Sequence, residues 1–298
     1  MILGGIEAGG TKFVCLLADG AGTILAEARF PTRGPGETMG EVLGFFRSAA
    51  AGGIRPDAVG IGAFGPLELR PGDRYGHIAS TPKPGWSGAD LVGPVRAALG
   101  VPVEIDTDVN AAALAEARWG AAQGLGSFVY MTVGTGIGAG ALVDGRPIHG
   151  LVHPEMGHVS VPRQAGDDFP GICPFHGACF EGMASGPAMS ARWGVPAQDL
   201  VGEARDRAVD LEARYLAEGL RNIVYALAPE RIVIGGGVAE MPGLLPAVQA
   251  RLVERLGGYP GLDEHAAEGF LTAAGLGQMA GPRGTLALAE IAVRGAAA

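Results

Sequence analysis

Short runs of mainly apolar residues, separated by turn-forming ones, fill the first thirty positions, a pattern typical of β-strands. Glu7-Ala-Gly-Gly-Thr-Lys12 and Asp19-Gly-Ala-Gly22 lie between the runs, so the pattern predicts three successive strands. The pattern returns over residues 127–149, around Gly134-Thr-Gly-Ile-Gly138. A repeated supersecondary unit predicts two related lobes. The strands predicted in the two copies are residues 2–6, 13–18, 24–30, 127–133, 139–143 and 146–149.

The remaining elements follow from helical or alternating periods bounded by turn residues. Helices are expected at residues 38–51, 91–99, 111–119, 244–256 and 285–293, with three more between 185 and 227. Strands are expected at residues 58–64, 101–105, 231–234 and 270–273. The stretch 65–87, rich in Gly and Pro, is too long for a structureless connection unless it shapes a site. The order of elements predicts an α/β chain.

The composition is that of a folded chain, with 48% hydrophobic and 18% charged residues among 298. The formal net charge of -9 and the lack of a basic run argue against a nucleic-acid surface. No basic segment followed by an apolar core opens the chain, and no apolar run approaches the ~20 residues of a membrane span. We therefore expect a soluble, cytoplasmic protein that binds neither nucleic acid nor membrane.

Asp106-Thr-Asp108 falls where the strand predicted at 101–105 meets the helix predicted at 111–119. Side chains at such a place lie at the C-terminal end of a strand and beside a helix N-terminus, where open α/β sheets bind ligands. The alternative is that Asp106 or Asp108 simply caps the helix. Because two caps are not needed, the other carboxylate is left for chemistry.

Two glycine turns join adjacent strands, at Gly9-Gly-Thr-Lys12 and Gly134-Thr-Gly136. Glycine lets the main chain approach anionic oxygens and present backbone N–H groups to them. Either turn alone is compatible with an ordinary hairpin, whereas the pair suggests a phosphate chain gripped from both sides. A third cluster, Gly235-Gly-Gly237, either admits an adenine ring or ends a strand. No Walker loop is present.

Lysine is rare in this chain, since Lys12 and Lys83 are the only lysines among 22 basic residues. Arginine is not equivalent to lysine where a compact ammonium group is needed. Lys12 belongs to the first glycine turn, and Lys83 lies in the stretch 65–87. We expect Lys83 either to reach the substrate or to order its own loop.

Two cysteines and two histidines have the spacing of a metal site: His158, Cys173, His176 and Cys179. Two thiolates and two imidazoles make a tetrahedral structural zinc set with no open position for catalysis. The alternative is a pair of free thiols in a loop, because a disulfide is disfavoured in a reducing cytosol.

Five motifs, in this order, resemble the ROK sugar kinases of the actin and hexokinase superfamily. They are Glu7-Ala-Gly-Gly-Thr-Lys12, Thr107-Asp-Val-Asn110, Gly134-Thr-Gly-Ile-Gly138, Glu155-Met-Gly-His158 and the Cys/His cluster. Thr81-Pro-Lys-Pro-Gly-Trp86 and Cys173-Pro-Phe-His-Gly-Ala-Cys179 resemble the zinc-containing bacterial fructokinases in particular. The resemblance runs through nearly the whole chain.

The resemblance implies a two-lobed ribonuclease H-like fold, ATP with Mg²⁺, a structural Zn²⁺ and a homodimer. The small first lobe would be residues 1–120 and the larger second lobe 121–298, with a zinc-binding insertion near 158–181. The C-terminal helix either stays with the second lobe or returns to the first.

Matched position by position, the resemblance makes Asp108 the catalytic base. The substrate-binding candidates are Thr107, Asp108, Glu155, Glu181, Lys83 and Gly65. The zinc ligands are His158, Cys173, His176 and Cys179. The phosphate and adenosine positions are Gly9, Gly10, Thr11, Lys12, Thr132, Gly134, Thr135, Gly136, Gly235 and Gly236. Many ROK glucokinases have Asp at Glu7 and Asn at Thr107, and these differences bear on sugar choice.

The implied reaction is transfer of the γ-phosphoryl group of ATP to O6 of fructose, with mannose, glucose or an N-acetylhexosamine as alternative acceptors. A sugar-binding regulator is the alternative outside the kinases. ROK repressors carry an N-terminal DNA-binding domain, whereas here the phosphate motif begins by residue 7. An NAD-linked oxidoreductase would need a helix after its glycine turn, but a strand is predicted after residues 134–138.

Overall fold

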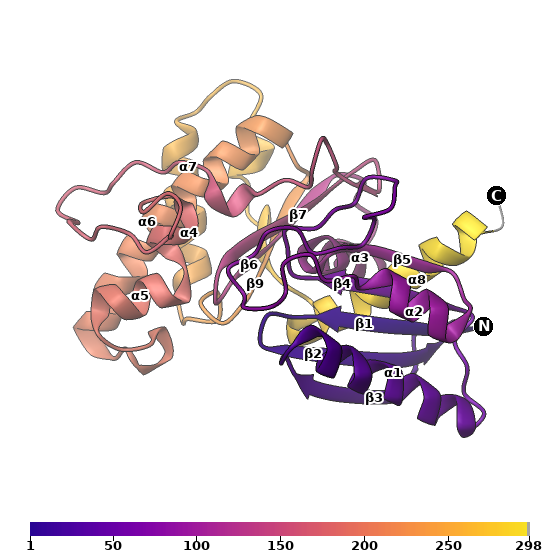
Figure 1. The fold of residues 1–298 in the computed structure, drawn as a ribbon. Coiled ribbons are helices and arrows are strands. Elements are labelled where there is room, and N and C mark those ends of the chain that lie inside the picture. Colours follow the sequence, from indigo (N-terminus) through magenta and orange to yellow (C-terminus); the bar gives the residue numbers. More distant parts are fainter. Residues whose placement is uncertain (297–298) are drawn as a thin grey trace. The chain divides into compact units, whose positions relative to one another are not determined.

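The structure, a computed structural model, describes residues 1–296 as two compact units, each with its own five-stranded sheet (Figure 1). The first unit comprises Met1–Gly120, Pro147–Pro154 and the C-terminal segment from Gln278. The second comprises Ala121–Arg146 and Glu155–Gly277. Residues 147–154 were expected in the second lobe. They belong to the first unit because the rings of His149 and His153 hydrogen-bond to it.

The sheet of the first unit has the order β3-β2-β1-β4-β5. β1 pairs antiparallel with β2 and parallel with β4, and β5 extends the parallel side. The strands are β1 Ile2–Ala8, β2 Lys12–Asp19, β3 Ile24–Pro31, β4 Ala58–Ala63 and β5 Val103–Thr107. β5 starts two residues later than predicted because Pro102 has no N–H for the ladder. At its other end, β5 extends to Thr107, which pairs with Ala63 of β4.

Helices cover both faces of this sheet (Figure 1). On one face Phe46 and Trp86 pack against Ile61. On the other face Leu286 packs against Leu3. The helices of the unit are α1 Pro35–Ala51, α2 Val92–Leu99, α3 Asp108–Trp119 and α8 Ala280–Ala296.

The C-terminal helix α8 lies almost on the backbone of the first sheet. A Cβ at Gly60 would lie 1.9 Å from the carbonyl oxygen of Thr285, and one at Gly284 would lie 1.9 Å from that of Ala111. Glycine is therefore required on both partners. The helix begins at Ala280, five residues before the predicted start, because tight packing overrides the low helix propensity of its glycines.

The second unit repeats the plan of the first, since its sheet has the order β10-β9-β6-β7-β8. β6 pairs antiparallel with β7 and parallel with β9, as β1 does with β2 and β4. The strands are β6 Phe128–Val133, β7 Ile137–Val143, β8 Arg146–Pro147, β9 Arg231–Gly235 and β10 Leu271–Ala273. The helices are α4 Phe180–Ala184, α5 Gly186–Trp193, α6 Gly202–Leu227 and α7 Leu244–Leu256. The predicted duplication is present in the strand order.

The three helices predicted between residues 185 and 227 are two α-helices, α5 and the 26-residue α6, joined through a short 3-10 turn. Gly219 does not end a helix, because a Cβ there would lie 2.3 Å from the ring of Phe180. This glycine serves side-chain packing inside α6. Of the helices within residues 1–296, none has the length and apolarity needed to cross a membrane.

Candidate active site and metal centre

The junction of β5 and α3 is built on three consecutive polar side chains. Thr107 is the N-cap of α3, and its hydroxyl accepts a hydrogen bond from the backbone N–H of Asn110 at 3.1 Å. The alternative in which an aspartate caps the helix is excluded, because the threonine hydroxyl already satisfies that amide. Asp108 is the first helical residue, and its Oδ1 accepts from the N–H of Val109 at 2.9 Å.

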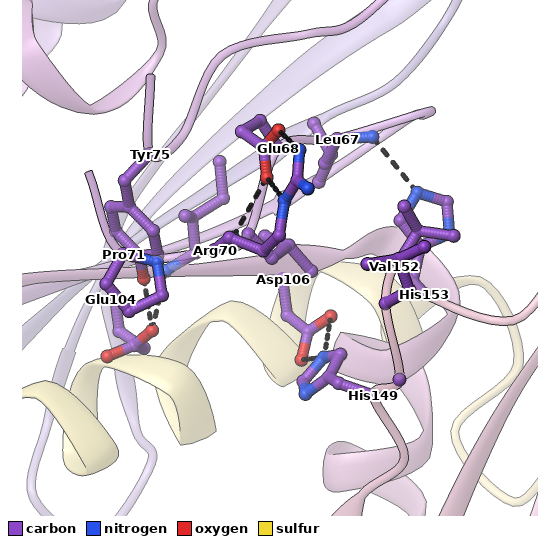
Figure 2. Close-up of a pocket in the computed structure, with 14 residues that line it drawn as sticks. Leu67, Glu68, Arg70, Pro71, Tyr75, Glu104, Asp106, His149, Val152 and His153 are labelled. Carbon is purple, nitrogen blue, oxygen red and sulfur yellow. Dashed lines mark hydrogen bonds and ion pairs between the residues drawn. The ribbon is translucent and has the colours of Figure 1, made fainter. Parts of the chain in front are cut away.

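Asp106 is 3% exposed and is held by several donors. Its Oδ1 accepts from the N–H of Thr107 at 2.7 Å and from Nδ2 of Asn110 at 2.8 Å. Nε2 of His149 lies 3.0 Å from Oδ2, and Figure 2 shows the two side chains pointing toward each other. The hydrogen bond to Asp106 raises the pKa of His149, which favours the imidazolium form.

A cavity of about 340 Å³ opens beside this junction, entirely within the first unit (Figure 2). One wall is β5, and the others are the loop 67–75 and the segment 149–153. Nε2 of His153 accepts from the N–H of Leu67 at 3.0 Å, and the Tyr75 hydroxyl donates to Glu104 at 2.5 Å. These contacts fix the loop that follows Gly65.

The first glycine turn is closed by the N–H of Gly9, which donates to the carbonyl of Lys12 at 3.0 Å. Thr32 supports the same turn, with its hydroxyl on the Gly9 carbonyl at 2.7 Å. Nζ of Lys83 donates to the carbonyl of Gly10 at 2.5 Å. The ammonium group of Lys83 thus contacts the first glycine turn and not its own loop, and contact with a substrate stays a prediction.

Glu7 is the second-to-last residue of β1, next to this turn, and is partly buried. Burial, reinforced by the negative charge of Asp108, raises the pKa of Glu7 to about 7, while Lys12 and Arg29 act in the opposite direction. The N-terminal turn of α8 lies against the carboxylate, since a Cβ at Gly281 would lie 2.0 Å from its Oε1. The carboxylates of Glu7 and Asp108 therefore repel each other. Carboxylate oxygens are the hard donors that Mg²⁺ prefers.

The second glycine turn and the third glycine cluster lie side by side in the second unit. The N–H of Gly134 donates to the carbonyl of Gly136 at 2.9 Å, which closes the turn. Gly236 has φ of +93°, and a Cβ there would lie 2.4 Å from the carbonyl oxygen of Val133. The glycine cluster after β9 thus packs on the residue that precedes the turn.

The four expected metal ligands form one cluster, with their ligand atoms within 4.8 Å of one another. His158 Nδ1 lies 3.5 Å from Cys179 Sγ, and Cys173 Sγ lies 3.7 Å from His176 Nδ1. Tetrahedral ligands about 2.0–2.3 Å from Zn²⁺ stand roughly 3.3–3.8 Å apart, so these two pairs have the spacing of a zinc site. Burial raises the pKa of the Cys179 thiol to about 11, so a metal must displace a proton to bind the thiolate.

The predicted site residues fall into two groups, one in each unit. The first unit brings Asp108 near Glu7 and Lys83 onto the first turn. The second unit brings Glu181 to the second turn and leaves Glu155 exposed, three residues before His158. The predicted residues in the first unit are Gly9, Gly10, Thr11, Lys12, Gly65, Lys83, Thr107 and Asp108. Those in the second unit are Thr132, Gly134, Thr135, Gly136, Glu155, Glu181, Gly235, Gly236 and the four expected metal ligands.

Sequence reasoning missed two histidines. His149 and His153 come from the segment between β8 and Glu155, and they hold Asp106 and the loop after Gly65. Their partners lie 43 and 86 residues away in the chain, so no local spacing marks them.

The chain belongs to the ROK family, which it matches over residues 3–292. The fructokinase of Zymomonas mobilis is 46% identical to it over 292 residues, which cover 97% of this chain and 96% of that protein. The putative fructokinase of Bacillus subtilis is 43% identical over 300 residues, which cover 100% of this chain and 98% of that protein.

Solved structures agree with this membership. The ROK hexokinase of Thermus thermophilus superposes with a TM-score of 0.81 at 30% identity, over 99% of this chain and 100% of that one. A ROK glucokinase from Streptomyces griseus, in complex with glucose and AMPPNP, gives a TM-score of 0.76 at 25% identity, over 98% and 100% of the two chains. The predicted fold, a two-sheet α/β member of the actin-like sugar kinase superfamily, is confirmed.

Proposed function

We propose that this chain is an ATP-dependent fructokinase that transfers the γ-phosphoryl group of ATP to O6 of D-fructose. The observation that carries the proposal is the β5–α3 junction, where Asp108 directly follows a strand end and shares its surroundings with Glu7. The full-length similarity to the fructokinases of Zymomonas mobilis and Pediococcus pentosaceus, at 46% and 38% identity, supports fructose as the acceptor.

In this proposal Asp108 accepts the proton of the O6 hydroxyl as that oxygen attacks the γ-phosphorus, and ADP leaves as the bond to the bridging oxygen breaks. The junction suits a base, because the Thr107 cap and the donors around Asp106 hold its backbone. Thr107, Glu155 and Glu181 bind sugar hydroxyls, with Gly65 in the loop held by His153.

The glycine positions bind the nucleotide. Gly9, Gly10, Thr11 and Lys12 form the first phosphate turn, and Thr132, Gly134, Thr135 and Gly136 form the second. Gly235 and Gly236 accept the adenosine. Backbone amides in such turns offset the charge of phosphate oxygens without side-chain reorganisation. Lys83 acts by fixing the carbonyl of Gly10 rather than by touching fructose.

Mg²⁺ would be held by Glu7 together with the ATP phosphates, and it supplies charge neutralisation for the transferred group. The raised pKa of Glu7 supports a cation at this place. A nearby cation stabilises the ionised form of Glu7, which burial and the charge of Asp108 otherwise disfavour.

Zn²⁺ fits the cluster of His158, Cys173, His176 and Cys179 in a structural role, since all four positions are filled by protein. The ion would brace the segment from Glu155 to Glu181. Chelation should therefore weaken fructose binding by about tenfold before it unfolds the chain, the loss typical when supports of a metal site are disturbed. Unchanged fructose affinity in zinc-free protein would remove this role. We also propose a cytoplasmic homodimer, which light scattering on the purified chain tests.

The test is sugar-dependent ADP release by zinc-loaded protein with ATP and Mg²⁺. Fructose should exceed mannose, glucose and N-acetylmannosamine in kcat/KM by about tenfold or more, the discrimination that a site with placed hydroxyl partners achieves. A higher kcat/KM for another hexose would replace the acceptor but keep the kinase. Absence of turnover with every sugar would remove the kinase and favour a sugar-binding regulator.

A further inference from the structure

The second glycine turn is held by residues that flank the metal ligands. Oε2 of Glu181 accepts a hydrogen bond from the backbone N–H of Ile137, the residue after Gly136, at 3.0 Å. The carboxylate lies so close to the turn that a Cβ at Gly136 would lie 2.5 Å from the same oxygen. Glu181 therefore contacts the turn itself and explains why residue 136 is a glycine.

A second contact involves the carbonyl group of Ile137. A Cβ at Gly157 would lie 1.7 Å from the carbonyl oxygen of Ile137, so the backbone of residue 157 lies directly against it. Both polar groups of the Ile137 backbone thus face the segment that contains the metal ligands, and the side chain of Ile137 is buried. The N–H, the carbonyl group and the side chain of Ile137 are therefore all held by neighbouring groups.

A third contact holds the beginning of the turn. The N–H of Gly186, at the start of α5, donates to the carbonyl of Gly134 at 2.8 Å. Ser185 caps α5 by accepting from the N–H of Ala188, and its own N–H donates to the carbonyl of Glu181 at 3.0 Å. The start and the end of the turn are therefore tied to one short stretch of chain, residues 181–186.

The metal cluster is one or two residues away from the first two of these contacts. Gly157 precedes the ligand His158, and Glu181 lies two residues after the ligand Cys179. The two ligand segments also pair with each other, since the N–H of Phe180 donates to the carbonyl of Val159 at 3.0 Å. An ion that draws His158 and Cys179 together would set the separation of Gly157 and Glu181 around Ile137.

We propose that Glu181 is a positioning residue for the second phosphate turn, and that the metal cluster controls nucleotide affinity through it. This proposal rests on the proposed kinase function, in which the turn binds ATP phosphates. Glu181 then has two roles on one side chain: Oε2 fixes the turn, and Oε1 remains for a sugar hydroxyl. Loss of the contact should weaken nucleotide binding even when no sugar is present.

The test measures the dissociation constant of AMPPNP with Mg²⁺ by calorimetry in the absence of sugar, on zinc-loaded protein. Glu181→Ala removes the acceptor and should weaken binding by about tenfold, the effect of a lost hydrogen bond to a charged group. Glu181→Gln keeps an oxygen acceptor and should stay within about threefold of the parent. Glu203→Gln, an exposed acid at the start of α6, is the matched control.

Gly136→Ala supplies an independent variant, because its methyl group would displace the Glu181 carboxylate while leaving the residue in place. It should weaken AMPPNP binding about as much as Glu181→Ala, and the double variant should be no weaker than either single one, since both remove the same contact. Additive losses would show that the two residues act separately and would overturn the proposal.

Removal of zinc is the third experiment that tests the proposal. Chelation should weaken AMPPNP binding to the parent but cause little further loss in Glu181→Ala, and it should speed hydrogen exchange of the peptide that contains Ile137. Zinc content and circular dichroism are recorded for each variant. Equal AMPPNP affinity for the parent and for zinc-loaded, folded Glu181→Ala would disprove the inference. A parent that binds no nucleotide would instead refute the proposed function.

Discussion

Nε2 of His149 lies 3.0 Å from Oδ2 of Asp106 and 3.1 Å from its Oδ1, so one imidazole bridges both oxygens of a buried carboxylate. Asp106 in turn accepts from the N–H of Thr107, the residue before the proposed base. The contact therefore ties the segment that leads to Glu155 to the strand end that carries Asp108. Neither side chain needs to touch fructose to influence the reaction.

Replacing His149 with alanine should lower kcat by about tenfold, the cost of an imperfectly placed catalytic group, while AMPPNP affinity stays within a factor of about two. The backbone around Asp108 loses one support but keeps the Thr107 cap. Steady-state kinetics with fructose, together with AMPPNP binding, checks this. His77→Ala, which removes a histidine that faces Asp90 in the same unit, is the control and should leave kcat unchanged.

Glu7 should give the reaction a pH dependence near neutrality. Its pKa is raised to about 7 by burial and by Asp108, so the carboxylate that would hold Mg²⁺ becomes protonated as the pH falls below that value. We expect the Mg²⁺ concentration for half-maximal activity to rise about tenfold per pH unit below 7, because one proton competes with the cation. Glu7→Gln should have a flat dependence and weak Mg²⁺ binding throughout.

The raised pKa of Glu7 also predicts that the free energy of unfolding falls as the pH rises, whereas Mg²⁺ binding improves. A pKa raised in the folded state means that folding binds the proton more tightly. The contribution is fully present below the ordinary value of 4.5 and is lost as the pH rises through about 7, a change of up to about 3 kcal/mol. Urea unfolding without Mg²⁺ at pH 5.5 and 8 measures this slope. A Glu7→Gln variant with the parent's slope would contradict the assignment.

The motifs that predict the candidate site are mostly local. Each glycine turn lies within a few adjacent residues, as does the Thr107-Asp108 pair. The structure also brings His158, Cys173, His176 and Cys179 together, although His158 precedes the nearer cysteine by 15 residues. The duplicated sheet was predictable as well, since the arrangement of strands and glycine turns repeats. The partners of Asp106 were not, because His149 comes from a segment that crosses back to the first unit.

Propensity also failed where packing decides. Gly219 inside α6 and Gly284 inside α8 read as helix-weakening residues, yet each fills a place where a Cβ would meet a ring or a carbonyl oxygen. Such contacts depend on chain segments far away in the sequence. The Thr107 cap was not predicted either: although two aspartates flank it, its hydroxyl accepts from the N–H of Asn110.

Gly60→Ala should destabilise the chain strongly. A Cβ at this position would lie 1.9 Å from the carbonyl oxygen of Thr285, so α8 would have to move off the sheet. We expect a loss of about 3 kcal/mol or more in the free energy of unfolding, typical of overpacking against backbone. Gly40→Ala, in α1 with open space around it, is the control and should be neutral or stabilising by up to about 1 kcal/mol. Thermal unfolding of both variants separates the two cases.

Glu212 on α6 is 1% exposed, and within residues 1–296 neither carboxylate oxygen has a hydrogen-bond partner. Burial holds the pKa of Glu212 well above its ordinary value, although the charge of Arg192 acts in the opposite direction. Glu212→Met, close in volume, should stabilise the chain at pH 8 by about 1–2 kcal/mol, because no buried acid remains to ionise.

The gain from Glu212→Met should shrink as the pH falls and vanish well below 4.5, since the parent carboxyl is then neutral in both folded and unfolded chains. Urea unfolding at pH 5 and 8 measures the difference. The same substitution at the exposed Glu203 of α6 should change stability by less than about 0.5 kcal/mol at either pH. Destabilisation of Glu212→Met at pH 8 would mean that the carboxylate has a partner in solution.

The most direct measurement is identification of the product formed from ATP, Mg²⁺ and D-fructose by the parent and by Asp108→Asn, with ³¹P and ¹³C NMR and the rate followed by ADP release. The parent should form fructose 6-phosphate. The variant should bind fructose and AMPPNP within about threefold of the parent but turn over about 10²–10⁴ times more slowly, the range for removal of a general base. Phosphorylation at another hydroxyl, or a variant that retains the parent's kcat, would contradict the account.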